Sequence, residues 1–266
     1  MALSKFTGKI VWVTGASSGI GEAFAKEFAA AGARLILSAR REKELERVAA
    51  LCSSAQSVSV LPLDLTQPER MADAAQRALK IAGRIDALVH NAAVSQRAPA
   101  ASTAYEVDDR LMRTNYLGPV ALTKAVLPSM LEKHQGHFIV VTSVLGKIGL
   151  PGRSGYCASK HALHGFFDTL RAEVANEGIH VTLALPGWVR TNVSINSLTG
   201  DGTPHGKMDP GTASGMTPEE CARRIIAAAE AGKDEVNVLR MKEGLALALS
   251  RFAPALFRRL IRNRPV

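Results

Sequence analysis

Residues 9–21 read KIVWVTGASSGIG, and this stretch decides the fold. Residues 9–14 are mostly apolar, as in a buried strand, and the chain then turns at glycines into residues 22–31, where apolar side chains recur at helical spacing. A strand, a glycine turn and a helix in this order predict the first unit of an α/β fold. Because the start of a helix presents free N–H groups, the turn also suits a phosphate.

The alternation of strands and helices continues along the chain. Further strands are predicted at 34–38, 57–63, 87–90, 137–143 and 180–185, and further helices at 42–52, 69–82, 108–132 and 158–176. Since parallel strands need crossover helices, we predict a doubly wound, Rossmann-like parallel sheet flanked by helices. With 266 residues, of which 47% are apolar, the chain is expected to form a single domain over residues 1–266. Residues 191–217 are rich in Gly, Ser, Thr, Asp and Pro and are predicted to form a substrate loop.

The glycine turn indicates a dinucleotide site. A pyrophosphate needs close backbone approach at a tight turn, which Gly15, Gly19 and Gly21 can provide. Their GxxxGxG spacing differs from the GxGxxG fingerprint, and glycine turns of this kind also occur for steric reasons alone.

The end of the second predicted strand bears on the choice of cofactor. An acid at this place suits a ribose 2′-hydroxyl, whereas an arginine suits a 2′-phosphate, and the chain carries Arg40 and Arg41 here. We therefore predict NADP(H), with NAD(H) as second choice, and expect nearby hydroxyls from Ser17 and Ser18. The alternative is that both arginines simply begin a solvated helix that continues with acidic residues.

Tyr156 and Lys160 lie four residues apart, so on a helix they share one face, and Ser143 lies thirteen residues before the tyrosine. A free phenol titrates near pH 10, but a cation at about 4 Å with an effective dielectric of about 20 contributes about 4 kcal/mol, or roughly three pKa units. Lys160 is therefore expected to lower the pKa of Tyr156. Tyr156 is predicted to act as acid or base and Ser143 to polarise the reacting carbonyl.

These motifs together resemble those of the short-chain dehydrogenase/reductase family in its single-domain form, from residue 8 to about residue 231. The resemblance rests on TGxxxGxG at 14–21, Asp64-Leu65, Asn91-Ala92, Asn115, Ser143, YxxxK at 156–160 and Pro186-Gly187. One position departs from the family pattern, because the usual Asn-Asn-Ala-Gly reads HNAA at residues 90–93. His90 is interpreted as structural.

The resemblance implies an oxidoreductase acting on a carbonyl or alcohol, with Asn115, Ser143, Tyr156 and Lys160 as catalytic residues. It gives Lys160 a second role at the nicotinamide ribose and gives Asn115 a water that connects Lys160 to solvent. The cofactor-binding residues expected from motif and resemblance are Gly15, Ser17, Ser18, Gly19, Ile20, Gly21, Arg40, Arg41, Asp64, Leu65, Asn91, Ala92, Tyr156, Lys160, Pro186, Gly187, Val189 and Thr191. A homodimer or homotetramer is also implied.

Cysteine spacing, net charge and the length of apolar runs indicate which kinds of site, partner and location to expect. The three cysteines are widely spaced, so we predict reduced thiols, neither disulfides nor a metal site. The net charge of +9 comes from dispersed residues without a nucleic-acid signature, and we expect no nucleic-acid partner. No apolar run approaches the roughly 20 residues of a membrane span, and the polar start does not read as a signal peptide, so a cytoplasmic location is expected.

The C-terminal tail, residues 245–266, mixes apolar residues with arginines and is predicted to be an amphipathic helix that Pro254 kinks or divides. It could contact an anionic membrane peripherally, cover the substrate mouth or pack in a subunit interface.

Other functions remain open at this level. Within the enzyme class they are an NAD-dependent alcohol dehydrogenase and a β-ketoacyl reductase; outside it, a non-catalytic NADP-binding sensor and an oligomeric scaffold. The substrate is expected to be small to medium-sized and hydrophobic, because four residues could line an apolar pocket: Leu145, Leu150, Trp188 and Val193. Core packing explains the same residues equally well.

Overall fold

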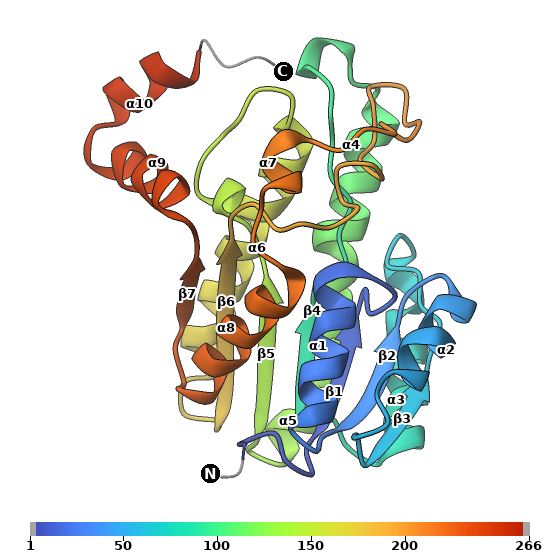
Figure 1. Ribbon diagram of the computed structural model, residues 1–266. Coiled ribbons are helices and arrows are strands. Elements are labelled where there is room, and N and C mark those ends of the chain that lie inside the picture. Colours follow the sequence, from blue (N-terminus) through green and yellow to red (C-terminus); the bar gives the residue numbers. More distant parts are fainter. Residues whose placement is uncertain (1–3, 263–266) are drawn as a thin grey trace.

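The computed structural model describes residues 4–262, which form a seven-stranded sheet with helices on both faces (Figure 1). Every paired strand runs parallel to its neighbour, in the order β3-β2-β1-β4-β5-β6-β7. The strands are β1 Ile10–Thr14, β2 Arg34–Ser38, β3 Ser57–Val60, β4 Ala87–His90, β5 Gly136–Val141, β6 Ile179–Pro186 and β7 Glu235–Val238. The predicted doubly wound parallel sheet is confirmed, and six of its strands coincide with predicted ones.

Helices form the crossover connections that parallel strands require. The α-helices are α1 Gly19–Ala30, α2 Glu42–Ala50, α3 Met71–Ala82, α4 Tyr105–Met112, α5 Gly118–Glu132, α6 Ser154–Glu173, α7 Pro210–Ala213, α8 Pro218–Glu230, α9 Met241–Phe252 and α10 Pro254–Ile261. Short 3₁₀ turns occur at η1 Pro68–Arg70, η2 Ala100–Ser102 and η4 Val144–Gly146, and a π-helical turn, η3, spans Arg113–Leu117.

The sheet separates two apolar layers. In β1, Val11 and Val13 face the layer covered by α1, α2 and α8, whereas Ile10 and Trp12 face the layer covered by α3, α5 and α6. This alternation follows from the two-residue repeat of a strand, and it explains why a strand buried on both faces reads as a continuous apolar run.

The predicted helix at 108–132 is confirmed, since every residue in this range is helical, although it starts earlier, at Tyr105, and contains a π-helical turn. α4 and α5 are separated by the π-turn, where the N–H of Gly118 bonds to the carbonyl of Arg113, five residues earlier. Pro119 supplies the physical reason, because it has no N–H to donate to the carbonyl of Asn115 four residues before it.

Two elements near the end of the sheet were not predicted. β7 is a short edge strand whose Glu235 and Asn237 are exposed, so its sequence lacks a full apolar pattern. α8 carried a recognisable signal, because Thr217 is its N-cap and accepts a hydrogen bond from the N–H of Glu220 at 3.1 Å.

The loop at 191–217, the C-terminal tail and the cysteines can also be compared with the sequence predictions. Residues 191–217 are mostly irregular as predicted, apart from α7. The tail is helical and Pro254 divides it into α9 and α10, although its last residues, 263–266, lie outside the described residues. The three cysteines are free and buried. Within residues 4–262, no helix is both long and apolar enough to cross a membrane.

Candidate functional site

The site lies where the strand order reverses between β1 and β4, at the carboxyl ends of both strands. In open α/β sheets this switch point is where ligands bind, because the loops that follow the two strands separate there. The glycine turn follows β1, and the chain that carries Asn91 follows β4.

The glycine turn depends on positive φ angles and on two close approaches of backbone atoms. Gly15 and Gly19 have φ angles of +67° and +59°, which favour glycine. A Cβ on Gly15 would lie 2.7 Å from the Cα of Ala92, and one on Gly21 would overlap the carbonyl oxygen of Gly15. Ser18 is the N-cap of α1 but makes no capping hydrogen bond through its side chain. The first N–H groups of α1 are thus available to a phosphate, and the residues present fit a dinucleotide.

Asn91 ties the two sides of the switch point together. Its Nδ2 donates to the carbonyl oxygens of Thr14 at 3.1 Å and Gly15 at 3.3 Å, and its backbone N–H donates to Thr14 Oγ1 at 3.1 Å. Asn91 and Ala92 therefore support the glycine turn from the β4 side. His90, just before them, is buried against Phe138 and Phe167, and burial first, then the charge of Lys160, lowers its pKa to about 3. His90 is a neutral core residue, as interpreted from the sequence.

Arg40 and Arg41 are exposed at the end of β2, and within residues 4–262 neither forms an ion pair with an acid. Arg41 Nη2 donates to Ser17 Oγ at 3.4 Å, so this guanidinium lies beside the glycine turn. Arg40 lines a cavity of about 420 Å³ whose other walls are Asp64, Thr66, Asp109, Arg110 and Arg113. The acids that begin α2 do not neutralise either arginine, and Glu44 pairs with Arg47 instead.

Asp64 and Leu65 differ in what they face. Asp64 lines this cavity, and its Oδ1 accepts hydrogen bonds from the N–H and hydroxyl of Thr66 at 3.0 and 2.8 Å. Leu65 is buried in the core, and a Cβ on Gly118 would overlap its carbonyl oxygen. Of the predicted pair, the structure therefore presents the Asp64 side chain to the cavity.

Ser143, Tyr156 and Lys160 come together beyond the end of β5. Ser143 is the N-cap of the short turn η4 and accepts a hydrogen bond from the N–H of Leu145 at 3.1 Å. Tyr156 and Lys160 lie one turn apart on α6, with Lys160 Nζ 5.8 Å from the centre of the Tyr156 ring. Lys160 is only 2% exposed, and its Nζ donates to the carbonyl of Val141 at 2.9 Å.

The pKa of Tyr156 departs from the expected direction. Burial raises it, and this outweighs the Ser143 hydroxyl, which can donate to the phenol oxygen, and the charges of Arg97 and Arg153. Burial also lowers the pKa of Lys160 to about 7. The expected lowering of the Tyr156 pKa is therefore not met in this arrangement, in which the lysine bonds to a backbone carbonyl.

Asn115 lies in the π-turn and forms hydrogen bonds to the loop after β4 and to α6. Its Oδ1 accepts from the N–H of Val94 at 2.9 Å, and its Nδ2 donates to the Val94 carbonyl at 2.9 Å and to Ser159 Oγ at 3.0 Å. Ser159 in turn donates to the carbonyl of Tyr156 at 2.8 Å. The amide of Asn115 thus links the loop after β4 to α6. Its predicted water relay stays a prediction.

The chain after β6 closes the far side of the switch point. Pro186 ends β6, and the N–H of Gly187 bonds to the carbonyl of Val238 at 3.1 Å. The side chain of Val189 is buried, and a Cβ on Gly19 would lie 3.0 Å from Thr191 Cγ2. Thr191 therefore lies directly against the glycine turn. Ile20, in the first turn of α1, is half-buried and packs against the core.

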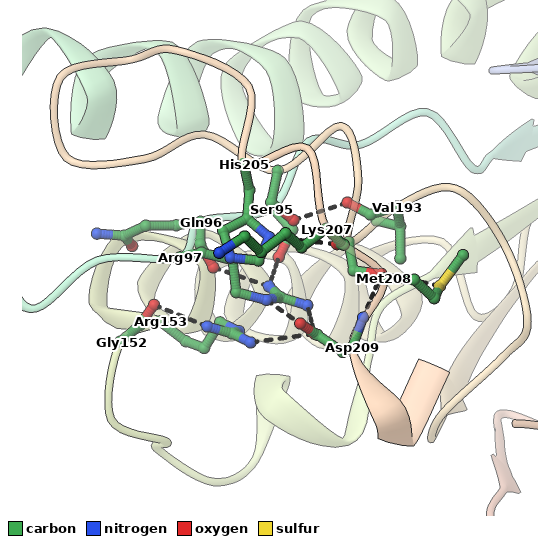
Figure 2. A network of polar contacts seen from close by, with 12 residues as sticks. Ser95, Gln96, Arg97, Gly152, Arg153, Val193, His205, Lys207, Met208 and Asp209 are labelled. Carbon is green, nitrogen blue, oxygen red and sulfur yellow. Dashed lines mark hydrogen bonds and ion pairs between the residues drawn. The ribbon is translucent and has the colours of Figure 1, made fainter. Parts of the chain in front are cut away.

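A polar network that the sequence analysis missed joins the predicted substrate loop to α6 (Figure 2). Asp209 Oδ2 accepts from Arg97 Nε at 2.8 Å and from Nη2 of the same guanidinium, and from Arg153 Nη2 at 3.4 Å. Arg97 also donates to Ser95 Oγ at 2.9 Å. The side chains of Arg97, Arg153 and Asp209 are 8%, 9% and 17% exposed. Because Arg153 is the N-cap of α6, the network lies one turn from Tyr156.

Replacing Asp209 is expected to destabilise the protein. Asp209→Asn would leave two nearly buried guanidiniums without a counter-charge, which costs about 3 kcal/mol for a buried pair. Burial, then the charge of Arg97, already lowers the pKa of Arg153 to about 10 with Asp209 in place. Urea denaturation measures the loss. The control Asp201→Asn makes the same change at an exposed position of the same loop, where an amide oxygen can keep the hydrogen bonds from Thr203, and should stay near wild type. Equal stability of both variants would contradict the network's role.

No local signal could have revealed this network, because Arg97 and Asp209 are 112 residues apart. The same holds for Ser159 as the partner of Asn115 and for Arg110 and Arg113 in the cavity beside Arg40.

Comparison with known proteins finds relatives from one protein family. The family described as short chain dehydrogenase matches residues 9–201. The Drosophila melanogaster dehydrogenase/reductase SDR family protein 7-like is 43% identical over 268 residues, which cover 99% of this chain and 82% of the fly protein. The Bos taurus dehydrogenase/reductase SDR family member 7B is 43% identical over 262 residues, 96% of this chain and 81% of the bovine protein. A short chain dehydrogenase from Burkholderia cenocepacia, solved in complex with NADP, superposes with a TM-score of 0.79 at 27% identity, covering 98% of this chain and 99% of that one.

Proposed function

Because this chain belongs to the short-chain dehydrogenase family, we propose that it transfers hydride between NADP(H) and a carbonyl or alcohol substrate. The observation that carries the proposal is the placement of Ser143, Tyr156 and Lys160 beside a glycine turn that fits a dinucleotide. A sensor that only bound the cofactor would have no need of this combination of acid, donor and cation.

In this proposal each side chain has a distinct task. Nicotinamide, when bound, supplies the hydride. Tyr156 donates its phenolic proton to the substrate oxygen as negative charge develops there, and the Ser143 hydroxyl donates a hydrogen bond to the same oxygen. Lys160, held by the Val141 carbonyl, has further N–H donors for the ribose hydroxyls. Asn115 positions α6 through Ser159.

The two directions of the proposed reaction are expected to respond differently to pH, because Tyr156 is the acid in reduction and the base in oxidation. A phenol whose pKa is raised by burial stays protonated at neutral pH, which is the form that a reductase requires. Oxidation of an alcohol needs the phenolate, so its rate is expected to rise as the pH increases toward the phenol pKa. Initial rates in both directions across the pH range test this, and an oxidation rate that falls with increasing pH would contradict it.

The proposed preference for NADP(H) rests on Arg40 and Arg41 at the end of β2, which form no ion pair with an acid among residues 4–262. Arg40→Asp removes a guanidinium that can bind a 2′-phosphate and adds a repulsive charge. It is expected to lower kcat/KM with NADPH relative to NADH by about tenfold to a hundredfold, since hydrogen bonds between charged groups contribute about 1.5–3 kcal/mol.

The matched control is Arg77→Asp, which makes the same change at an exposed position of α3. It should leave the ratio of the two cofactors unchanged. If Arg40→Asp also leaves the ratio unchanged, Arg40 is a solvated helix residue and the cofactor assignment fails.

The substrate is proposed to be small to medium-sized and hydrophobic. Leu145 lies in η4, two residues after Ser143, and is half-buried, as is Leu150. The ring of Trp188 lies against Gly211 of the predicted substrate loop. The test follows the decay of NADPH absorbance with hydrophobic ketones, steroids, aldehydes and β-ketoacyl compounds. Turnover with one of these classes supports the proposal, and tight NADPH binding without turnover on any of them would favour a sensor.

A further inference from the structure

The terminal helix pair, α9 and α10, is unlike the rest of the molecule. Within the described chain neither helix contains a buried residue, although both are rich in apolar side chains. Figure 1 shows the pair at the periphery, beyond the end of the edge strand β7. Of the alternatives for the tail, the described residues do not show burial against its own domain, and the exposed apolar residues can meet another partner.

The exposed apolar side chains follow helical spacing. In α9, Leu245 and Phe252 are seven residues apart and are 60% and 82% exposed; in α10, Leu256 and Leu260 are four residues apart and are 48% and 56% exposed. Single exposed apolar residues are ordinary, but two consecutive helices that both present them mark an interaction surface.

The charges of the pair have one sign. Residues 240–262 contain six basic residues and one acid, Glu243. The carboxylate of Glu243 bonds inward, to the N–H of Arg240 at 2.8 Å and of Trp188 at 3.4 Å. Arg251, Arg258 and Arg259 are exposed, and within residues 4–262 no ion pair neutralises them. The outward surface of the pair is thus apolar and cationic.

A cavity of about 520 Å³ opens beside these residues. It joins apolar and basic side chains of α9 to the edge of the sheet, and its walls include Lys147, Leu239, Met241, Leu247, Arg251 and Phe252. The lining also contains Glu235, which pairs with Lys147 at 3.0 Å, so Arg240 and Arg251 are the lining cations that remain for an anionic headgroup, beside apolar side chains that suit acyl chains.

We propose that α9 and α10 form a docking surface for a membrane that contains anionic phospholipid. Short amphipathic helices with apolar side chains and arginines lie in the membrane interface, where the apolar residues enter the acyl region and the arginines meet the headgroups. A second copy of the chain fits less well. A symmetric contact would bring the arginines of both copies together, and within residues 240–262 the one acid, Glu243, bonds inward. This inference does not depend on the proposed reaction.

The test is co-sedimentation of the full chain with phosphatidylcholine vesicles that contain or lack phosphatidylserine. Binding is expected to be about tenfold or more tighter with phosphatidylserine and to weaken at high salt. Arg258→Glu with Arg259→Glu should abolish the preference for anionic vesicles. Phe252→Ser with Leu256→Ser should weaken binding to them about tenfold, because each removes an exposed apolar anchor.

Two matched controls make the same changes elsewhere on the exposed surface. Arg70→Glu with Arg77→Glu reverses two charges at the start and middle of the α3 region, and Leu51→Ser removes an apolar side chain that is 51% exposed after α2. Both should bind vesicles as the wild type does. Circular dichroism confirms that each variant is folded.

Three results would overturn the proposal: no binding of the full chain to either vesicle, equal binding to both, or unchanged binding of the two α9–α10 variants. Light scattering without lipid identifies the competing occupant. If the wild type ignores vesicles but forms an oligomer that Phe252→Ser with Leu256→Ser dissociates, a second copy covers the pair.

Discussion

Tyr156→Phe is expected to lower kcat/KM for carbonyl reduction about a thousandfold, which corresponds to about 4 kcal/mol of transition-state stabilisation. The substitution removes one hydroxyl and leaves the ring on α6, where it lies near Lys160. Without the phenol no proton donor is placed at the substrate oxygen, and the Ser143 hydroxyl alone can polarise but is a poor acid. Steady-state rates with NADPH and the best substrate measure the loss.

Cofactor affinity separates this effect from misfolding. The glycine turn and Arg40 are untouched by the change, so NADPH should bind Tyr156→Phe with near wild-type affinity. Tyr105→Phe is the matched control, because Tyr105 is 78% exposed at the start of α4 and should retain full activity. Activity of Tyr156→Phe within a few-fold of the wild type would remove Tyr156 from the mechanism.

Gly21→Ala is expected to cost about 3 kcal/mol of stability, since a methyl group forced into a filled space moves backbone atoms. Its Cβ would overlap the carbonyl oxygen of Gly15 and lie 2.6 Å from Asn91 Nδ2. Relieving the overlap displaces the glycine turn and its hydrogen bonds to Asn91. NADPH affinity should fall about a hundredfold, because the turn no longer presents its N–H groups to the pyrophosphate.

Gly165→Ala provides the control for this substitution. Gly165 is exposed on α6, and a Cβ there would meet no atom within 4 Å. It should keep its NADPH affinity and gain up to about 1 kcal/mol, because alanine favours a helix over glycine. Urea denaturation and NADPH titration of both variants give the comparison, and a Gly21→Ala protein with normal affinity would show that the turn is not the cofactor cradle.

Much of the fold could be predicted because the signals for it are local. A strand buried on both faces reads as an apolar run, and a helix shows its apolar spacing within a few turns. The failures are also local in origin. β7 carries exposed polar residues at the sheet edge, and the π-turn before α5 depends on a missing N–H at Pro119 that the apolar spacing does not reveal.

In the candidate site, too, some features could be predicted from local motifs and others could not. The glycine turn, Asn91, Ser143, Tyr156 and Lys160 could be identified from short motifs, and the sheet topology brings their segments to one switch point. The pKa of Tyr156 could not be predicted, because its direction depends on burial and on the partner that Lys160 finds, the Val141 carbonyl.

By itself, the sequence determined the order of strands and helices, the glycine turn and the spacing of tyrosine and lysine on one helix face, since each depends on residues close along the chain. Only the tertiary structure decided that Asp209 pairs with Arg97 and Arg153, that Asn115 bonds to Ser159, and that α9 and α10 leave their apolar side chains exposed. The physical reason is that these features depend on which distant segments pack together and on how much water each side chain retains, and neither is encoded in local spacing.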